Sequence, residues 1–265
     1  MAALTADYDR EILKILGSRI DSLVNDDAAA AHEPDKEVAD DGDDDIRALD
    51  ILSLTVASSQ REGRPLRLVE TFSTIKSLIF AGHDTTATLM SWVCYLLGTH
   101  LSIEEKVLKE IDSVLGSRTE PTLADLSALT HLGDVIKEAL RLFPAAGSAR
   151  IGPKGAKLCG YDVENVIVYV APFVIHRVPS LWGADADVFR PERWSDDQIN
   201  PDHFVPFSRG RADCLGQKFA LLEGKTILAT VYRQFVFRPV KEIRAKRALT
   251  LIPGEDCEMR VMKRS

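Results

Sequence analysis

The chain has 265 residues, 45% of them hydrophobic, and a formal net charge of −7. This length suits one large domain or two small ones with a substantial core, and the acidic charge argues against a nucleic-acid binder that neutralises phosphates broadly. The four cysteines form no CxxC pair, so neither a zinc motif nor a disulfide framework is indicated, and a reducing compartment is favoured.

The amino-terminal part predicts a helix followed by an acidic loop. Residues 1–20 have an amphipathic pattern and lack the features of a signal peptide. Residues 26–45 are acidic and almost free of large apolar side chains, which predicts a solvated, disordered loop. No apolar run is long enough to span a bilayer, so we expect no membrane anchor within this chain.

A long helix is expected next. Apolar residues recur at steps of three and four from Leu68 to Leu97. This spacing predicts one helix over about 65–99, long enough to cross the whole domain.

Two shorter helices follow in the pattern. The first covers about 102–115, with Ser102 as its N-cap and Glu105 at the capping-box position. The second covers about 132–142 and ends before Pro144.

The rest of the chain alternates between short strands and irregular segments. Residues 151–177 are rich in β-formers with glycine and proline punctuation, and residues 178–213 show little periodicity. A last helix is expected from near Cys214 to near Gln234, and short strands over about 235–263. The fold class is therefore mainly α with small β-sheets.

Cys214 stands between a charged loop and the first turn of this last helix. The flanking Gly210 and Gly216 allow the backbone to approach something flat or bulky. A helix that begins here directs free amide N–H groups towards the sulfur, and Arg209 and Arg211 add positive potential. A nucleophile or a metal ligand would suit this setting. On these residues alone, a buried inert cysteine is an equal alternative.

The segment AGHDTT, residues 81–86, lies in the middle of the long predicted helix. Gly82 lowers helix stability by roughly 1 kcal/mol relative to alanine, and Asp84 is unfavourable in a core without partners. We expect a widened turn here that a ligand or water fills, with Asp84 and Thr85 as a proton-delivery pair. A solvent-facing polar patch is the alternative.

Two further segments pair charges. Glu138 and Arg141 lie three residues apart on one helix face, where an ordinary surface ion pair is the usual interpretation. In FRPERW, residues 189–194, Pro191 interrupts regular structure and Arg193 could reach back to a carboxylate. A simple loop arginine is the alternative.

Taken together and in this order, the four segments resemble the carboxy-terminal half of cytochrome P450, the family of haem-thiolate monooxygenases. The oxygen-activation motif matches residues 81–86, and the Glu-x-x-Arg motif matches Glu138 and Arg141. Arg193 resembles the residue that completes the family's Glu-Arg-Arg triad. The cysteine-loop signature Phe-x-x-Gly-x-Arg-x-Cys-x-Gly is matched by Phe207, Gly210, Cys214 and Gly216. The resemblance covers nearly everything from about residue 45 onward, and residues 171–194 resemble fungal members in particular.

The resemblance implies a role for each matched residue of the cysteine loop. Cys214 would be the axial thiolate ligand of the iron of haem b. Gly210 and Gly216 would let the loop and helix lie under the porphyrin, and Phe207 would shield the sulfur.

It also implies roles for the other motifs. Asp84 and Thr85 would relay protons to dioxygen at the haem. Glu138, Arg141 and Arg193 would form a structural triad that holds the segment leading to the cysteine.

The chain departs from the family in two ways. The arginine usually found two residues before the cysteine is replaced by Ala212, with Arg211 one place earlier as a substitute, and Arg150 matches a further propionate contact. The chain is also much shorter than the family's catalytic domain. We therefore expect residues 1–265 to form a single incomplete cytochrome P450 domain. The alternative to an active monooxygenase is a truncated, inactive fragment that binds haem weakly or not at all.

Partners are implied by the same resemblance. Electrons would come from NADPH through a cytochrome reductase, and the substrate would be a small apolar molecule. We expect a basic face on the cysteine side to meet an acidic reductase surface, with an ordinary solvated face as the alternative. This face comprises Arg209, Arg211, Lys218, Lys225 and Arg233. Intact relatives are often anchored at the endoplasmic reticulum, and the sequence determines neither substrate nor localisation. His176 and His203 are expected to be structural or exposed and not metal ligands.

Overall fold

The structure is a computed structural model, and it describes most of the chain from residue 51 onward. The described residues are Ile12, Lys14, Gly17, Ser18, 51–63, 65, 67–195, 199–248, 250–254 and 257–264. The acidic loop predicted over 26–45 lies outside them, and the four described residues of the predicted amino-terminal helix are helical. Among the described residues, no helix has the length and apolar character to cross a membrane.

The chain divides into two compact units, residues 1–81 and 82–265. In the first unit, α2 (Ile51–Arg61), which the sequence pattern did not reveal, precedes the first part of α3 (Leu68–Thr99). The long helix predicted over 65–99 is therefore present and ends at the expected residue. The second unit holds the rest of α3 and every candidate site residue.

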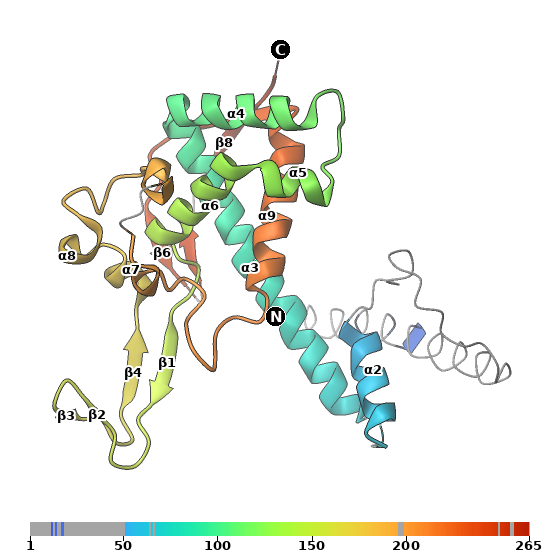
Figure 1. The fold of residues 1–265 in the computed structure, drawn as a ribbon, viewed down its shortest axis with the longest axis vertical. Coiled ribbons are helices and arrows are strands. Elements are labelled where there is room, and N and C mark those ends of the chain that lie inside the picture. Colours follow the sequence, from blue (N-terminus) through green and yellow to red (C-terminus); the bar gives the residue numbers. More distant parts are fainter. Residues whose placement is uncertain are drawn as a thin grey trace, which may run out of the picture. The chain divides into compact units, whose positions relative to one another are not determined.

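Helices build the core of the second unit (Figure 1). The carboxy-terminal part of α3 packs with α4 (Leu101–Leu115), α5 (Leu123–Ala128), α6 (Thr130–Leu142) and α9 (Gln217–Tyr232). Their apolar stripes meet in one cluster of buried side chains, which includes Val93, Leu97, Ile111, Leu132, Ile136 and Leu228. The mainly α class is thus confirmed.

The start of α4 differs from the expectation. The helix begins at Leu101, and its N-cap position, His100, makes no side-chain capping bond. The predicted cap at Ser102 is wrong because only His100 separates α3 from α4, so Ser102 already lies inside the first turn. A capping box does occur in α5, where Thr122 and Asp125 exchange side-chain and backbone bonds.

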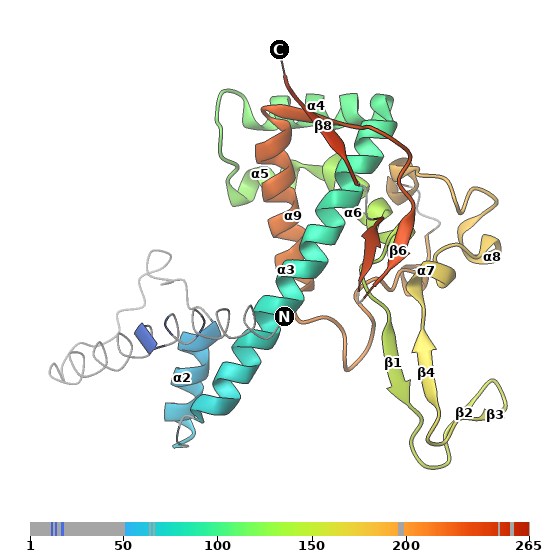
Figure 2. The same ribbon diagram turned by 180° about the vertical axis from the view of Figure 1, so that it is seen from behind.

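Small antiparallel sheets flank the helices (Figure 2). Within the described residues the strands form two-stranded ladders: β1 (Ser148–Ile151) with β4 (Ile167–Val170), β2 (Lys157–Leu158) with β3 (Tyr161–Asp162), β5 (Phe235–Pro239) with β8 (Met259–Lys263), and β6 (Ala245–Arg247) with β7 (Leu251–Pro253). The strands predicted over 235–263 are therefore present.

The segment between β4 and α9 contains short helical turns. These are α7 (Pro172–Ile175), α8 (Pro179–Trp182), η1 (Pro191–Ser195) and η2 (Pro201–His203). The β-rich stretch predicted over 151–177 therefore ends at Val170, because Pro172 sets the first turn of α7. Each of these turns begins with a proline. The expectation of irregular structure over 178–213 therefore missed α8, η1 and η2, because proline also suits the first turn of a helix.

Candidate active site

The loop that carries Cys214 turns sharply before α9. The backbone N–H of Cys214 donates to the Phe207 carbonyl at 2.8 Å, which closes the loop on itself. Gly210 adopts a left-handed φ of 88° and Ser208 one of 63°, so the turn needs the conformational freedom of glycine at its tip. The helix α9 begins at Gln217, three residues after the cysteine and close to the start expected from the sequence.

The Cys214 thiol is exposed and lies beside an apolar surface. Leu215 is 86% exposed and Phe219 is 68% exposed, values unusual for large apolar side chains next to a core. At Gly216, an added Cβ would lie 4.0 Å from the Cys214 sulfur, so the absence of a side chain keeps space beside the thiol open. A cysteine sulfur on an open apolar face fits an iron porphyrin, because haem iron accepts a thiolate ligand and the porphyrin is a broad apolar plane.

Arg150, at the end of β1, reaches this loop from another part of the chain. Its Nη2 donates to Ser208 Oγ at 3.3 Å and to the Ala212 carbonyl at 3.4 Å. Arg150 is itself exposed. The structure therefore places the guanidinium group of Arg150 against the cysteine loop at Ala212.

Behind the loop, Glu138 and Arg141 form a fully buried pair. Both side chains are 0% exposed, and Arg141 donates to both Glu138 oxygens, at 2.9 Å from Nε and 2.8 Å from Nη2. Arg193 Nε donates to Glu138 Oε1 at 2.8 Å. The interpretations as a surface ion pair and a simple loop arginine are thus wrong, because α6 faces the η1 turn and buries all three groups.

Further partners complete this network. The indole N–H of Trp194 donates to Glu138 Oε2 at 3.1 Å. Arg141 also donates to the carbonyls of His176, at 2.8 Å, and of Val188, at 3.0 Å. Buried charges are tolerated only when they are paired and hydrogen-bonded. These hydrogen bonds therefore explain how the charged groups of the triad can be buried in the core. No pattern in the sequence indicated Trp194 or His176 as members.

A family model for cytochrome P450 matches residues 16–253, which is most of the chain. The chain belongs to the cytochrome P450 family. It is 40% identical over 190 residues to cytochrome P450 4V2 of Mus musculus, an alignment that covers 69% of this chain and 36% of that protein. It is 35% identical over 217 residues to cytochrome P450 3A29 of Sus scrofa, covering 78% of this chain and 43% of that protein.

A plant relative gives a similar match. Cytokinin hydroxylase of Arabidopsis thaliana is 39% identical over 172 residues, which cover 64% of this chain and 33% of that protein. The chain thus spans between a third and a half of the length of these three relatives.

In this P450 chain residues 81–86, which resemble the family's oxygen-activation motif, lie on α3. Residues 82–86 are regular α-helix, so the widened turn expected there is wrong. An added Cβ at Gly82 would meet no described atom within 4 Å. No other described segment therefore packs so closely against Gly82 that only a glycine would fit. Asp84 is half-buried, and its Oδ2 accepts a hydrogen bond from Thr250 Oγ1 at 2.8 Å. Thr250 was not among the residues that the sequence pattern indicated.

The basic face expected on the cysteine side is smaller than predicted. Arg209 pairs with Asp202, and Arg233 Nη1 donates to Asp112 Oδ1 at 2.8 Å. Of the expected cations that the structure describes, Arg211 and Lys218 are exposed and have no hydrogen-bond or ion-pair partner.

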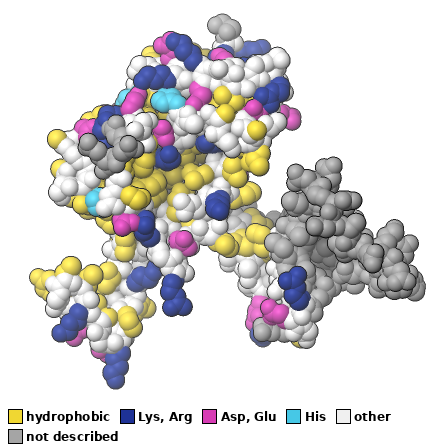
Figure 3. All heavy atoms as spheres, in the orientation of Figure 1, with side chains coloured by type: hydrophobic (Ala, Val, Ile, Leu, Met, Phe, Trp, Pro, Cys, Tyr) yellow, Lys and Arg dark blue, Asp and Glu magenta, His cyan; other side chains and the backbone are white. Residues whose placement is uncertain are grey.

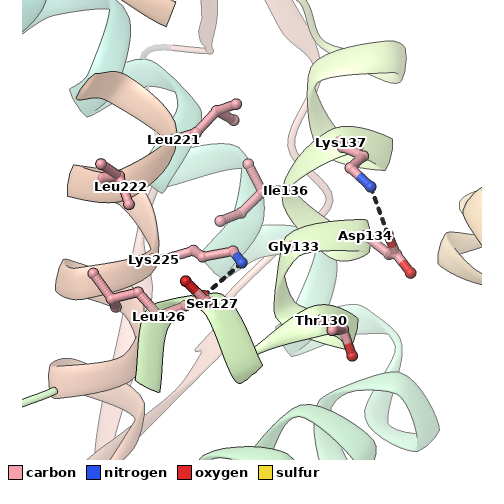
Figure 4. Close-up of a pocket in the computed structure, with 10 residues that line it drawn as sticks. All are labelled: Leu126, Ser127, Thr130, Gly133, Asp134, Ile136, Lys137, Leu221, Leu222 and Lys225. Atoms are coloured by element: carbon pink, nitrogen blue, oxygen red, sulfur yellow. Dashed lines mark hydrogen bonds and ion pairs between the residues drawn. The ribbon is translucent and has the colours of Figure 1, made fainter. Parts of the chain in front are cut away.

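Lys225 is half-buried in a cavity of about 450 Å³ between α5, α6 and α9 (Figure 4). Its Nζ donates to the Leu126 carbonyl at 2.7 Å, and burial lowers the pKa of its ammonium group. Hydrophobic side chains gather in the hollow beside α6 and α9 on the face seen in Figure 3. Lys225 therefore belongs to the packing of these helices and not to an exposed basic face.

Proposed function

We propose that this chain is the carboxy-terminal portion of a haem-thiolate monooxygenase. The observation that carries the proposal is the exposed Cys214 thiol, held beside an apolar surface at the start of α9 by a loop closed on Phe207. The reaction inserts one oxygen atom of O₂ into a C–H bond of an apolar substrate. The other oxygen atom leaves as water, with two electrons and two protons supplied: RH + O₂ + 2e⁻ + 2H⁺ → ROH + H₂O.

The residues around Cys214 are suited to hold haem b. Cys214 would donate its sulfur to the iron, and Gly210 and Gly216 would leave the face of the porphyrin clear of side chains. Phe207 is half-buried against the core and would shield the sulfur from water. Arg150 and Arg211 are exposed cations at the loop and would pair with the haem propionates.

Asp84 and Thr85 would deliver the protons that the reaction consumes. When bound, haem supplies the activation of dioxygen. A half-buried carboxylate next to a hydroxyl on the same helix can pass a proton inward from solvent, and the fixed position of the Asp84 carboxylate favours this role. The name of the plant relative, a hydroxylase, accords with this reaction class.

Electrons would come from an NADPH-dependent reductase. Lys218 lies in the first turn of α9, close to Cys214 in sequence, and its charge is free to attract an acidic partner surface. Because Arg209, Lys225 and Arg233 are engaged elsewhere and Arg211 is assigned to a haem propionate, the contact rests on Lys218.

The decisive experiment is a carbon monoxide difference spectrum of the reduced chain, purified after expression with added haem precursor. We expect the Soret band typical of thiolate ligation in wild type and in Cys159→Ala, which removes another exposed cysteine. Cys214→Ala should lose the band. A chain without haem, or a band that survives in Cys214→Ala, would refute the proposal and leave the fragment interpretation.

A further inference from the structure

The turn between β6 and β7 carries Thr250 onto the middle of α3. Thr250 Oγ1 donates to Asp84 Oδ2 at 2.8 Å, across 166 positions of sequence. The Thr250 side chain is almost completely buried, at 6% exposure. A buried hydroxyl needs a hydrogen-bond partner, and the Asp84 carboxylate accepts the hydrogen bond of this one.

Thr250 is held in place from several directions. Its own carbonyl accepts from the N–H of Ala248 at 2.9 Å, and the N–H of Leu251 donates to the Ala145 carbonyl at 2.8 Å. The indole N–H of Trp92 donates to the Leu251 carbonyl at 2.8 Å. The turn is thus attached to α3 at two points, Asp84 and Trp92, which lie about two helical turns apart.

Trp92 is a rigid anchor for this attachment. Its ring is fully buried and stacks on Phe143, with 3.8 Å between the centroids and an interplanar angle of 7°. The backbone next to Thr250 therefore cannot move away from α3 without breaking a buried contact. Asp84, by contrast, is only half-buried on the surface of a helix, and its carboxylate would otherwise sample several rotamers.

The bond uses one carboxylate oxygen and leaves the other open. Within the part of the chain that the structure describes, Oδ1 of Asp84 accepts no hydrogen bond. We infer that Thr250 is a positioning residue: its hydroxyl fixes Oδ2 of Asp84, so that Oδ1 is presented in one orientation as the oxygen that takes up and releases the proton. The consequence for catalysis rests on the proposed function, whereas the fixed carboxylate is a property of the chain itself.

The fixed carboxylate can be tested without haem. In the full chain, Thr250→Val removes the hydroxyl at nearly constant volume, and Thr250→Ser restores it. We expect the ¹³C carboxyl resonance of Asp84, assigned by its loss in Asp84→Asn, to shift in Thr250→Val and to return towards the wild-type position in Thr250→Ser. Thr230→Val is the matched control, because it removes a half-buried hydroxyl that bonds a helix carbonyl in α9. It should leave the resonance in place.

A double-mutant cycle gives a second readout. Thr250→Val and Asp84→Ala, alone and together, should show a coupling of about fivefold in the unfolding equilibrium constant, the usual size for one partly buried hydrogen bond. An unshifted Asp84 resonance together with additive effects on unfolding would overturn the inference.

The haem-loaded chain separates this inference from the proposed function. With wild-type spectra and haem content, Thr250→Val should send a severalfold larger share of the electrons to hydrogen peroxide (O₂ + 2e⁻ + 2H⁺ → H₂O₂), and Thr250→Ser should restore the wild-type share. If the wild-type chain takes up no haem, the proposed function fails while the resonance and the cycle still decide the position of Asp84. If haem binds and Thr250→Val sends the same share of electrons to hydrogen peroxide as wild type does, the catalytic consequence is overturned.

Discussion

His176 links the end of α6 to the segment that leads to Cys214. Its Nε2 accepts the backbone N–H of Val205 at 3.0 Å, and its Nδ1 lies 3.0 Å from the Arg141 carbonyl. Because an amide N–H can only donate and a carbonyl can only accept, the ring must be the neutral tautomer with its proton on Nδ1. The ring is fully buried and lies against Phe204 and Trp182.

This arrangement predicts a loss of stability in mild acid. Burial lowers the pKa of His176 to about 4 from an ordinary 6.5, with the charges of Arg141 and Arg177 acting in the same direction and the bond to the Arg141 carbonyl opposing them. As the pH falls from 6.5 to 4, the unfolded chain gains a proton on this histidine and the folded chain does not. The stabilisation of the fold by neutral His176 is therefore complete above about pH 6.5. The free energy of unfolding declines by about 3 kcal/mol as the pH falls towards 4.

The free energy of unfolding, measured by denaturant titration across this range, checks the prediction. His176→Asn cannot titrate there, so its stability should fall less steeply than that of wild type between pH 6.5 and 4. Parallel curves for the two proteins would contradict the assignment of a neutral His176.

The buried triad predicts a large effect from one neutralisation. Glu138→Gln leaves the guanidinium groups of Arg141 and Arg193 buried without their carboxylate, which should destabilise the fold by about 3 kcal/mol or more. Glu105→Gln is the matched control, because Glu105 pairs with Lys109 at 2.6 Å on an exposed face of α4. That variant should lose less than about 1 kcal/mol. Equal losses in the two variants, measured by chemical unfolding, would show that burial does not set the strength of the triad.

Two glycines of α3 should respond with opposite signs to the same substitution. An added Cβ at Gly98 would lie 2.6 Å from the Phe237 carbonyl oxygen and 3.0 Å from Pro239 Cδ, so Gly98→Ala must push β5 away. We expect a loss of about 1–3 kcal/mol. At Gly82 the Cβ meets no described atom within 4 Å, and Gly82→Ala should raise stability by up to about 1 kcal/mol. Thermal unfolding of both variants checks this, and a stabilised Gly98→Ala would refute the close packing of α3 against β5.

The reductase contact predicts a salt-dependent loss of electron transfer. In the haem-loaded chain, Lys218→Glu should lower the rate of reduction by the reductase severalfold at low salt, with the difference shrinking as ionic strength rises. Lys157→Glu, an equal charge change on β2, is the control and should have little effect. Reduction at the wild-type rate in Lys218→Glu would exclude this cation from the contact.

Much of this P450 chain could be predicted from the sequence because the relevant relationships are local. The three- and four-residue spacing of apolar side chains predicts α3, and Glu138 and Arg141 share a face of α6 because they are three residues apart. The glycines around Cys214 similarly lie within a few residues of it. Each of these relationships depends on backbone geometry that a short stretch of chain determines by itself.

Other features depended on which segments the fold brings together. Only the tertiary structure shows that Thr250 meets Asp84, that His176 bonds Val205, and that Lys225 points into a cavity and not to solvent. Nothing near Lys225 in the sequence distinguishes it from an exposed lysine such as Lys218. Polar side chains become buried and form long-range hydrogen bonds when the apolar faces of helices and strands pack together. The sequence pattern identifies those apolar faces but does not show which polar side chains they enclose.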